Sequence, residues 1–284
     1  MRNFTFKGLF LAVVFMVLGS LSIQAADDGL ITKQITVKLE KAGTLRDKIG
    51  STKRDKITNL KIIGEINGSD WSVIRYMAGR DYYGSESDGK LAILDLSETK
   101  IVSGGGRYLY DDYYIDYFYT HDNELGSRAF YNCSGLTSLS LPSGITSIGW
   151  EAFSGCSGLT SLSFPSGITS IGGYAFSGCS GLTSIYVYAE KLPNMGSDVF
   201  DGCDAKKCTV YVPKGTYDDY WLSEFGYFEN IVEFDPTGIN NVITSNDTKE
   251  LSRYSLNGQR LSAPTKGLNI VKYSDGSVKK VVVQ

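Results

Sequence analysis

Residues 133–155 read CSGLTSLSLPSGITSIGWEAFSG, and residues 156–178 nearly repeat them as CSGLTSLSFPSGITSIGGYAFSG. Cys133, Cys156 and Cys179 mark the period, since they follow one another at intervals of 23 residues. A fixed period of this length is typical of a solenoid, in which each rung buries its apolar side against neighbouring rungs. The sequence therefore predicts a repeat solenoid.

Each regular unit contains a set of apolar positions that are expected to point inward. In the first unit these are Leu136, Leu139, Leu141, Ile145, Ile148, Phe153 and Cys156. The L-x-x-L-x-L phrase of residues 136–141 predicts a short strand with side chains alternating between inside and outside. Residues 145–148 predict a second extended side, and residues 151–153 predict a tight helical turn. Each rung should thus hold a strand and a short helical turn.

Weaker copies of the unit extend the array in both directions. Downstream, the matching positions are Leu182, Ile185, Val187, Leu192, Met195, Phe200 and Cys203, followed by a strand at residues 210–213. Upstream, the matching positions are Leu125, Ala129 and Phe130, with earlier strand centres at residues 94–96 and 60–62. The solenoid is expected to span residues 57–235 and to contain about six rungs, more than the roughly three needed for stability.

Caps are expected at both ends of the solenoid. The N-terminal cap is predicted at residues 26–56, with a strand at 35–39 and a helical turn at 44–49 that begins at Thr44 as N-cap. At the other end, aromatic side chains are predicted to cover the last rung, and these are Tyr220, Trp221, Phe225 and Phe228.

Insertions interrupt the units at about residues 79–90 and 102–124. The second insertion holds Tyr108, Tyr110, Tyr113, Tyr114, Tyr117 and Tyr119. Insertions in repeat proteins often map to the binding face, and tyrosine provides a large contact area at low entropic cost. These tyrosines are therefore candidate ligand-binding residues, although a variable loop without a ligand is an open alternative. The interspersed aspartates lack the spacing of a calcium loop.

The outward positions of the predicted strands form a second candidate surface. They are Asp95, Ser138, Ser140, Ser161, Ser163, Ser184, Tyr186, Tyr188 and Tyr211. Tyrosine is a far stronger contact residue than serine in binding interfaces. The candidate ligand-binding residues on this surface are therefore Asp95, Tyr186, Tyr188 and Tyr211.

Charge divides the chain into two parts. The formal net charge is −3, but from Thr237 onward seven cations outnumber three acids, so the preceding part is distinctly acidic. Such asymmetry indicates two units with different surroundings. The acidic body argues against nucleic acid as a partner, because nucleic-acid affinity comes chiefly from neutralising phosphates.

Residues 1–25 have the pattern of a secretory signal peptide. Arg2 and Lys7 precede an apolar run at residues 9–18, and small residues around Ala25 offer a cleavage site. The apolar run is short for a membrane span, and no other segment could cross a bilayer. Export is expected, with an N-terminal anchor helix as the alternative.

A separate C-terminal module is predicted at residues 250–284, after a polar linker at 236–249. Asn257-Gly258 and Asp275-Gly276 each favour a two-residue hairpin between short strands. The apolar positions Leu268, Ile270, Val281 and Val283 alternate along those strands. A small all-β module should result.

The phrases LTSLSLPSGITSIGWEAFSGC at residues 136–156 and TVYVPKGTYDDYW at 209–221 resemble the BspA-like leucine-rich repeats of Bacteroidetes. The resemblance implies a leucine-rich-repeat fold over most of residues 36–234. It also implies adhesion to host extracellular-matrix proteins or to other bacteria.

The tail resembles the C-terminal sorting domain of type IX secretion cargo in its Tyr254 strand, its Asn257-Gly258 turn and its Gly267–Ile270 phrase. That resemblance implies a contact with the export machinery, passage through the outer membrane and display at the cell surface.

The cysteines of the repeat are expected to form a ladder of buried thiols, because their side chains point inward in parallel. Adjacent rungs lie close enough that distance alone does not forbid disulfides. A local bridge between Cys203 and Cys208 is an alternative.

No catalytic constellation is apparent. His121 is the only histidine and lies in the tyrosine-rich insertion, where nothing positions it as a base. Zinc-ligand spacing is absent, and Gly104-Gly105-Gly106 lacks the context of a phosphate loop and indicates a flexible segment. We predict no catalytic residue, metal or cofactor.

The sequence favours an exported, non-catalytic, adhesin-like protein that binds an extracellular protein or a glycan at the cell surface or after secretion. The alternative is a structural, self-associating protein of the cell envelope, with a periplasmic location.

Overall fold

The computed structural model describes residues 29–111, 116–235, 250–255, 260–261, 263, 266–273 and 278–283. The predicted signal peptide, the first residues of the predicted cap and the predicted linker lie outside these ranges.

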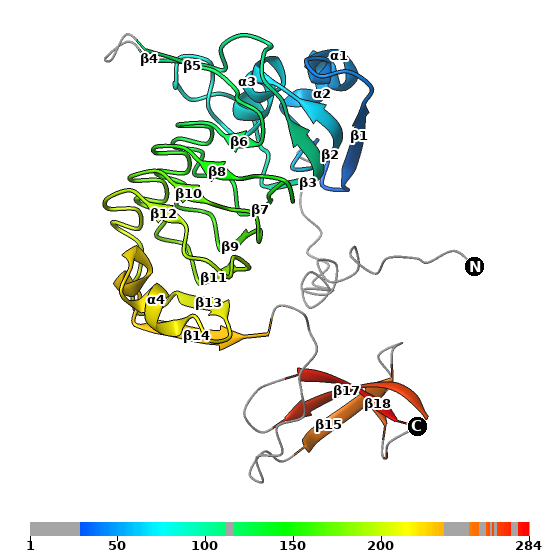
Figure 1. Cartoon of the computed structure of the whole chain (residues 1–284). Coiled ribbons are helices and arrows are strands. Elements are labelled where there is room, and N and C mark those ends of the chain that lie inside the picture. The colour runs from blue at the N-terminus through cyan, green and yellow to red at the C-terminus, as the bar shows by residue number, and fades with distance from the viewer. Residues whose placement is uncertain are drawn as a thin grey trace, which may run out of the picture.

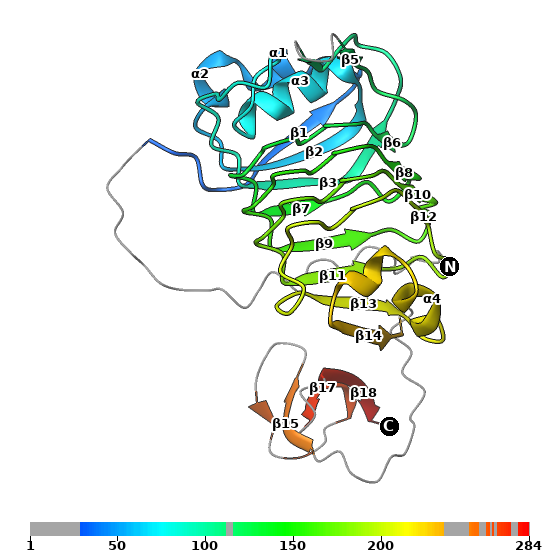
Figure 2. The same ribbon diagram turned by 90° about the vertical axis from the view of Figure 1, so that its left-hand side faces the viewer.

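The main body is a ladder of parallel strands, one from each rung. Figure 2 shows them stacked one above another, and they are β1 (Ile35–Leu39), β2 (Asn59–Ile66), β3 (Ile93–Ile101), β7 (Ser138–Ser140), β9 (Ser161–Phe164), β11 (Ser184–Val187), β13 (Thr209–Pro213) and β14 (Asn230–Phe234). Hydrogen bonding divides them into sheets β1-β2-β3-β7 and β14-β13-β11-β9, and the Thr160 N–H donates to the Thr137 carbonyl between β9 and β7. The ladder holds eight strands, of which β1 and β14 belong to the two caps, and the six strands between them agree with the expected number of about six rungs.

The opposite side of the solenoid carries a second, narrower parallel sheet (Figure 1). Its strands are β6 (Glu124–Leu125), β8 (Ser147–Ile148), β10 (Ser170–Ile171) and β12 (Asn194–Met195). Threonines beside both sheets bind one rung to the next, since the hydroxyl groups of Thr160 and Thr183 donate to the carbonyls of Thr137 and Thr160. Thr169 does the same on the second side, toward Thr146.

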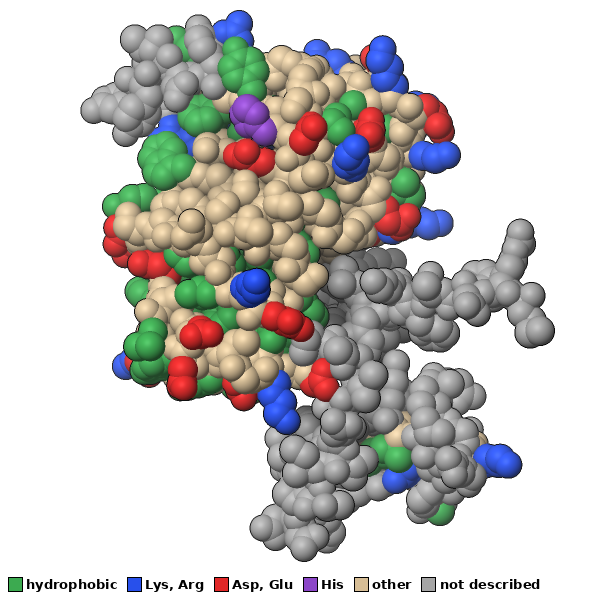
Figure 3. All heavy atoms as spheres, viewed as in Figure 1, with side chains coloured by type: hydrophobic (Ala, Val, Ile, Leu, Met, Phe, Trp, Pro, Cys, Tyr) green, Lys and Arg blue, Asp and Glu red, His purple; other side chains and the backbone are tan. Residues whose placement is uncertain are grey.

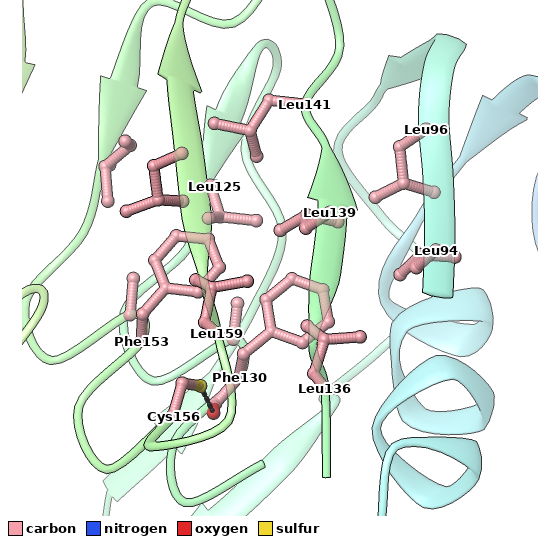
Figure 4. Close-up of a cluster of buried hydrophobic side chains, with 14 of the residues drawn as sticks. Leu94, Leu96, Leu125, Phe130, Leu136, Leu139, Leu141, Phe153, Cys156 and Leu159 are labelled. Carbon is pink, nitrogen blue, oxygen red and sulfur yellow. Dashed lines mark hydrogen bonds between the residues drawn. The ribbon is translucent and has the colours of Figure 1, made fainter. Parts of the chain in front are cut away.

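The predicted inward positions of the regular unit are buried, as the repeat pattern required. Phe130, Phe153, Phe176 and Phe200 stack in a column, with centroid separations of 5.3, 5.0 and 5.7 Å between successive rings. Figure 4 shows the stacked rings of Phe130 and Phe153 among the leucines of neighbouring rungs. Burying this much apolar surface is the main force that holds the rungs together.

Cys133, Cys156, Cys179 and Cys203 form the predicted ladder of buried thiols, and Cys208 is also buried and unpaired. The thiols of Cys156, Cys179 and Cys203 donate to the carbonyl oxygens of Phe130, Phe153 and Phe176, over 3.0, 3.2 and 3.3 Å. Each thiol therefore satisfies a buried carbonyl of the preceding rung.

The regular rungs turn through a chain of hydrogen-bonded turns, where a short helical turn was expected. One position per rung takes a left-handed backbone with glycine, at φ 75° for Gly155, 72° for Gly178 and 73° for Gly202. Glycine adopts this conformation without steric cost, which explains the recurring S-G and D-G pairs.

The N-terminal cap comprises β1, α1 (Leu45–Ile49) and α2 (Ser51–Arg54). Thr44 occupies the N-cap position of α1 as predicted, but its hydroxyl donates to the Lys41 carbonyl and does not cap the helix. The buried carboxylate of Asp70 accepts from the Gly43 and Leu45 N–H groups over 2.6 and 2.9 Å. The cap is thus held in place by Asp70, which lies 25 residues after Leu45 in the sequence.

Asp70 belongs to α3 (Gly68–Met77), a helix that the repeat pattern did not predict. Its carboxylate also accepts from the Asn67 N–H over 3.0 Å, and the Asn67 side chain accepts from the Ser69 N–H over 3.1 Å. These two contacts form a capping box.

The tyrosine-rich insertion contains a hairpin of β4 (Leu109–Asp111) and β5 (Asp116–Phe118). The preceding glycines are not a loose segment, which corrects our expectation. The Gly104 carbonyl accepts from the Gly68 N–H, and the Gly105 carbonyl accepts from the Ser69 hydroxyl. A Cβ at Gly105 would overlap the Asn67 side chain, so this position requires glycine for close packing.

The C-terminal cap comprises α4 (Tyr217–Trp221), the 3-10 helix η1 (Glu224–Tyr227) and β14. Tyr220, Phe225 and Phe228 are fully buried over the last rungs, but Trp221 is exposed, which corrects its predicted role. Leu192 was also predicted to point inward and is exposed, because the irregular segment before β12 turns its side chain outward.

The C-terminal region contains a four-stranded antiparallel sheet in the order β16-β15-β17-β18. Its strands are β15 (Glu250–Ser255), β16 (Arg260–Leu261), β17 (Gly267–Tyr273) and β18 (Val278–Val283). The predicted turn residues at 257–258 and 275–276 lie outside the described residues. Among the described residues, no helix is long and apolar enough to span a bilayer.

Candidate functional site

One continuous row of outward side chains crosses the strand ladder. Strand register aligns Lys61 with Asp95, Asp95 with Ser140, Ser163 with Tyr186, and Tyr186 with Tyr211. We name the outward side of β7, β9, β11 and β13 the serine–tyrosine face, made of Ser138, Ser140, Ser161, Ser163, Ser184, Tyr186, Tyr188 and Tyr211. The structure thus brings Tyr186, Tyr188 and Tyr211 together and places Asp95 at the far end of the same row.

The serines of this face are partly exposed, and their hydroxyl groups have no hydrogen-bond partner in the described structure. Within the part of the chain that the structure describes, the hydroxyl groups of Ser138, Ser140, Ser161, Ser163 and Ser184 make no hydrogen bond to the protein. The neighbouring threonines differ, since Thr160 and Thr183 use their hydroxyls to join the rungs. The serine hydroxyls therefore remain available as donors and acceptors for a ligand.

The tyrosines form an aromatic cluster at the C-terminal end of the face. The rings of Tyr186 and Tyr211 are stacked, with centroids 4.5 Å apart and planes inclined by 6°. Phe234 of β14 meets the rings of Tyr188 and Tyr186 edge-on, at 5.3 and 6.3 Å. Burial, followed by the proximity of Tyr211 and Tyr188, raises the pKa of Tyr186. The Tyr186 hydroxyl is therefore protonated at neutral pH and able to donate.

The opposite end of the row is charged. Lys61 Nζ lies 2.7 Å from Glu98 Oε1 and 3.2 Å from Asp95 Oδ2. The hydrogen bond to Glu98 raises the pKa of Lys61 against the opposing effect of burial. Burial alone would raise the pKa of Asp95, but hydrogen bonds from Ser97 and Lys61 outweigh it and lower that pKa. Asp95 is thus ionised and largely occupied by its own neighbours.

The regular rungs carry almost no charge. Between Asn132 and Ala189, Glu151 is the only ionisable acid or base of the Asp, Glu, Lys, Arg and His types. Its carboxylate pairs with Arg128, with Nε and Oε2 2.6 Å apart. Figure 3 shows charged side chains gathered toward the two ends of the visible face, with few over the regular rungs between them.

Only part of the tyrosine-rich insertion lies at the surface of the molecule. Tyr108 is buried, and its hydroxyl donates to the Ser127 carbonyl over 2.6 Å, so it belongs to the core. We therefore correct its assignment as a ligand-binding residue. The neighbouring Leu109 is buried as well.

The remaining tyrosines of the insertion divide into three groups. Tyr119 is exposed, and Tyr110 is half-buried against the ring of Tyr83 at 6.1 Å. The side chain of Tyr117 and the whole of Tyr113 and Tyr114 lie outside what the structure describes. The Tyr110 N–H donates to the Tyr82 carbonyl, so the two insertions are joined in one surface that the sequence did not predict.

A second row of polar side chains, which the sequence did not predict, follows the turns of the rungs and is exposed at Tyr174 and Asp198. Glu151, Tyr174 and Asp198 hold left-handed backbones at φ 50°, 55° and 55°, in line with Arg128 at 56°. The two near-identical units differ at this position, with Glu151 in one and Tyr174 in the other. That difference in the sequence could have pointed to this row. Arg128 pairs with Glu151 in this row, and hydrogen bonding with Asp198 raises the pKa of Tyr174.

Neither an enclosed pocket for a reaction nor a cluster of metal ligands is evident among the described residues. No group of three or more His, Cys, Asp or Glu side chains could hold a metal ion. One shallow pocket of about 300 Å³ is lined by residues including Arg80, Lys90 and Asn132, and another is lined by residues including Ile101 and Pro142. His121 is exposed and lies outside the lining of either pocket.

Part of the chain matches a known repeat family. Residues 115–220 match the family described as BspA type leucine rich repeat region, in six copies. A leucine-rich repeat protein from Bacteroides ovatus, solved by crystallography, is 22% identical with a TM-score of 0.38. That match covers 63% of this chain and 43% of the Bacteroides chain, so this chain spans less than half the length of that protein. No protein of curated function matches the chain.

Proposed function

Because residues 115–220 match BspA-type leucine-rich repeats, we propose that this chain is an exported, non-catalytic binding protein with an adhesin-like role at the cell surface. Its ligand would be a protein or a glycan, held on the serine–tyrosine face. Leucine-rich-repeat proteins generally mediate binding and are typically non-catalytic. Proteins with BspA-like repeats are typically extracellular or at the cell surface.

The observation that carries this proposal is the pairing of free serine hydroxyls with the stacked rings of Tyr186 and Tyr211 on one rigid ladder. Binding sites on regular strands are held more firmly than sites on loops. Tyrosine is enriched among the residues that dominate binding energy. The insertion surface offers Tyr83 and Tyr119 as exposed contacts, but its hairpin tip extends beyond the described residues.

Export is supported by the charged and apolar pattern of residues 1–25. The C-terminal sheet of residues 250–283, with its resemblance to sorting domains of type IX cargo, supports passage through the outer membrane. These two segments would act in sequence, the first at the inner membrane and the second at the outer membrane.

Protease treatment of intact producing cells tests the location. We expect the solenoid to be digested on intact cells while a periplasmic marker protein survives. Protection of the solenoid until the outer membrane is broken would place it in the periplasm and refute the adhesin-like role.

Binding of the purified mature chain to immobilised panels of matrix proteins and glycans tests the site. We expect binding to at least one panel member, with loss of that binding on the paired change Tyr186→Ala and Tyr211→Ala. Tyr217→Ala, on an exposed aromatic side chain of the C-terminal cap, is the matched control and should leave binding unchanged. Equal binding by the paired variant would refute the assignment of the face.

A structural role through self-association is a second candidate, favoured by one specific feature. The C-terminal cap exposes five large apolar side chains close together in sequence, Tyr217, Trp221, Leu222, Tyr227 and Val232. Exposed apolar patches of this kind often mark interaction sites. Light scattering on the mature chain separates the two functions, since concentration-dependent assembly that Trp221→Ser abolishes supports the structural role.

A further inference from the structure

We infer that the ligand of the serine–tyrosine face is a neutral carbohydrate, one ring of which stacks on Tyr186 while its hydroxyls bond to the serines. This inference rests on the proposed binding function and specifies its ligand. It follows from three features of the face: an open aromatic ring, free hydroxyl groups and the lack of charge.

The ring of Tyr186 has one covered and one open side. Its stacking with Tyr211 at 4.5 Å and 6° means that the ring planes stand across the direction that joins neighbouring strands. The other side of the ring consequently faces β9, where Ser163 is the register partner of Tyr186. A serine side chain is too small to cover a phenol ring. A ligand ring with an apolar side can occupy the space above Ser163 and contact Tyr186.

The floor beside this ring consists of hydroxyl groups without partners in the described structure. Ser140 and Ser163 follow Tyr186 toward the N-terminal end of the row, and Ser138, Ser161 and Ser184 form a parallel row beside them. Each hydroxyl both donates and accepts, as the hydroxyls of a sugar do. Anionic ligands are instead bound by cations or by free backbone N–H groups, and the ladder's N–H groups are used between strands.

The near absence of charged side chains on this face disfavours charged ligands. Glu151 is the only charged residue between Asn132 and Ala189, and Arg128 already neutralises it at 2.6 Å. Sulfated or phosphorylated ligands would find no cation on this face to offset their desolvation. A neutral polyol pays no such cost for leaving water beside serine hydroxyls.

The serine floor lies between Tyr186 and Asp95, the charged residue beyond the N-terminal edge of the face. Asp95 on β3 and Tyr186 on β11 are separated by three strand intervals, which is about 14 Å at the usual spacing. Ser140 and Ser163 occupy the positions between them. The intervening floor suits a short stretch of a polysaccharide laid across the strands, with Tyr186 as the wall at one end.

Affinity electrophoresis of the mature full chain, in native gels containing laminarin, yeast mannan or galactan, tests this inference, with heparin as the charged comparison. We expect retardation by at least one neutral polysaccharide, unchanged between low and high salt, and none that survives high salt with heparin. Tyr186→Ala should weaken binding by about tenfold or more, as for an aromatic residue that contributes much of the binding energy. Tyr186→Phe should preserve it, because the ring remains.

A blocking variant separates stacking from folding. Ser163→Phe adds an aromatic ring over the open side of Tyr186 without altering that residue, and exposed strand positions tolerate aromatic side chains. It should abolish retardation while the melting temperature stays close to that of the parent chain. Unaltered retardation in Ser163→Phe would overturn the stacking geometry.

The remaining outcomes distinguish the inference from the proposed function. Retardation by no neutral polysaccharide, together with Tyr186-dependent binding to an immobilised matrix protein, would overturn the carbohydrate and leave the binding function intact. Binding to either class that ignores both Tyr186→Ala and Ser163→Phe would overturn the site itself. Salt-sensitive retardation by heparin alone would overturn the neutrality argument.

Discussion

The thiol of Cys156 donates a hydrogen bond to the carbonyl oxygen of Phe130, one rung earlier, over 3.0 Å. The same contact recurs from Cys179 to Phe153 and from Cys203 to Phe176. A residue that could have been a disulfide partner therefore acts as a buried donor between rungs. This arrangement has consequences for thiol chemistry and for stability.

We predict that stability falls at alkaline pH because of these thiols. Burial raises the pKa of Cys133 from its ordinary 9.0 to about 11 and that of Cys203 to about 12. The stability gained from keeping the thiols neutral is fully present below pH 9 and is lost as pH rises from 9 toward the folded pKa values. Urea unfolding across this window should show the decline, and Cys133→Ala should make it shallower.

We predict that a thiol reagent will not label the folded chain. All five cysteines are buried, so the thiolate that reacts is both inaccessible and disfavoured. Labelling with a chromogenic disulfide should reach five thiols in denaturant and close to none without it. Rapid labelling of native protein would contradict the ladder.

We predict that Phe153→Ala destabilises the chain by about 3–5 kcal/mol, because it leaves a cavity in the phenylalanine column. Phe153 stacks on Phe130 at 5.3 Å and on Phe176 at 5.0 Å. Leu222→Ala is the control, since Leu222 is 84% exposed and its loss should change stability by less than about 0.5 kcal/mol. Chemical denaturation monitored by circular dichroism measures both.

We predict that Asp70→Asn destabilises the N-terminal cap by about 2–4 kcal/mol. The buried carboxylate accepts from the N–H groups of Gly43, Leu45 and Asn67, and hydrogen bonds to charged groups contribute about 1.5–3 kcal/mol each. An amide nitrogen in place of one oxygen would face a donor. Hydrogen exchange should speed up at residues 43–49 in this variant, and Asp218→Asn on the exposed side of α4 should leave those rates unchanged.

We predict opposite outcomes for two tyrosines of the insertion. Tyr108→Ala should destabilise the chain by about 3–5 kcal/mol, the range for large aromatic truncations in a core, because Tyr108 is 1% exposed. Tyr119→Ala should change stability by less than about 0.5 kcal/mol, since Tyr119 is 49% exposed. Thermal unfolding of the two variants, side by side, makes the comparison. Similar melting temperatures would contradict the burial of Tyr108.

The regular rungs could be predicted from sequence because their contacts repeat. Leu136, Phe153 and Cys156 each lie next to the equivalent residue of the adjacent unit. The spacing of 23 residues therefore predicts both that a residue is buried and which residue packs against it. Local alternation then separates Leu139, which points inward, from Ser138 and Ser140, which point outward.

Contacts without a repeat could not be predicted in this way. Asp70 holds Leu45 across 25 residues, and the spacing of the units carries no information about that pair. The capping-box pattern of Asn67 and Asp70 was nevertheless visible in the sequence and would have identified α3. β14 follows an aromatic cap without the L-x-x-L-x-L phrase, so the last strand was missed.

The candidate site was predictable in part. Alternation placed Tyr186, Tyr188 and Tyr211 on one outward surface, and the register places Tyr186 beside Tyr211. Composition misled at Tyr108, because tyrosines in an insertion look alike until their packing is known. The adjacent Leu109 and the Leu125 that follows the insertion are both buried, and these apolar residues were the hints that this part of the chain returns to the core.

Residues 133–155 and 156–178 are nearly identical, so the length of the serine–tyrosine face can change by whole repeat units. Duplication of one such unit within the gene would insert a complete rung with its own Thr, Cys and Phe contacts, and would leave both caps as they are. Tyr186 would then move away from Asp95 by one strand interval, about 4.8 Å. Loss of a unit would bring them closer by the same amount. Recombination between the repeats can therefore tune the reach of this surface in fixed steps, without any point mutation at a contact residue.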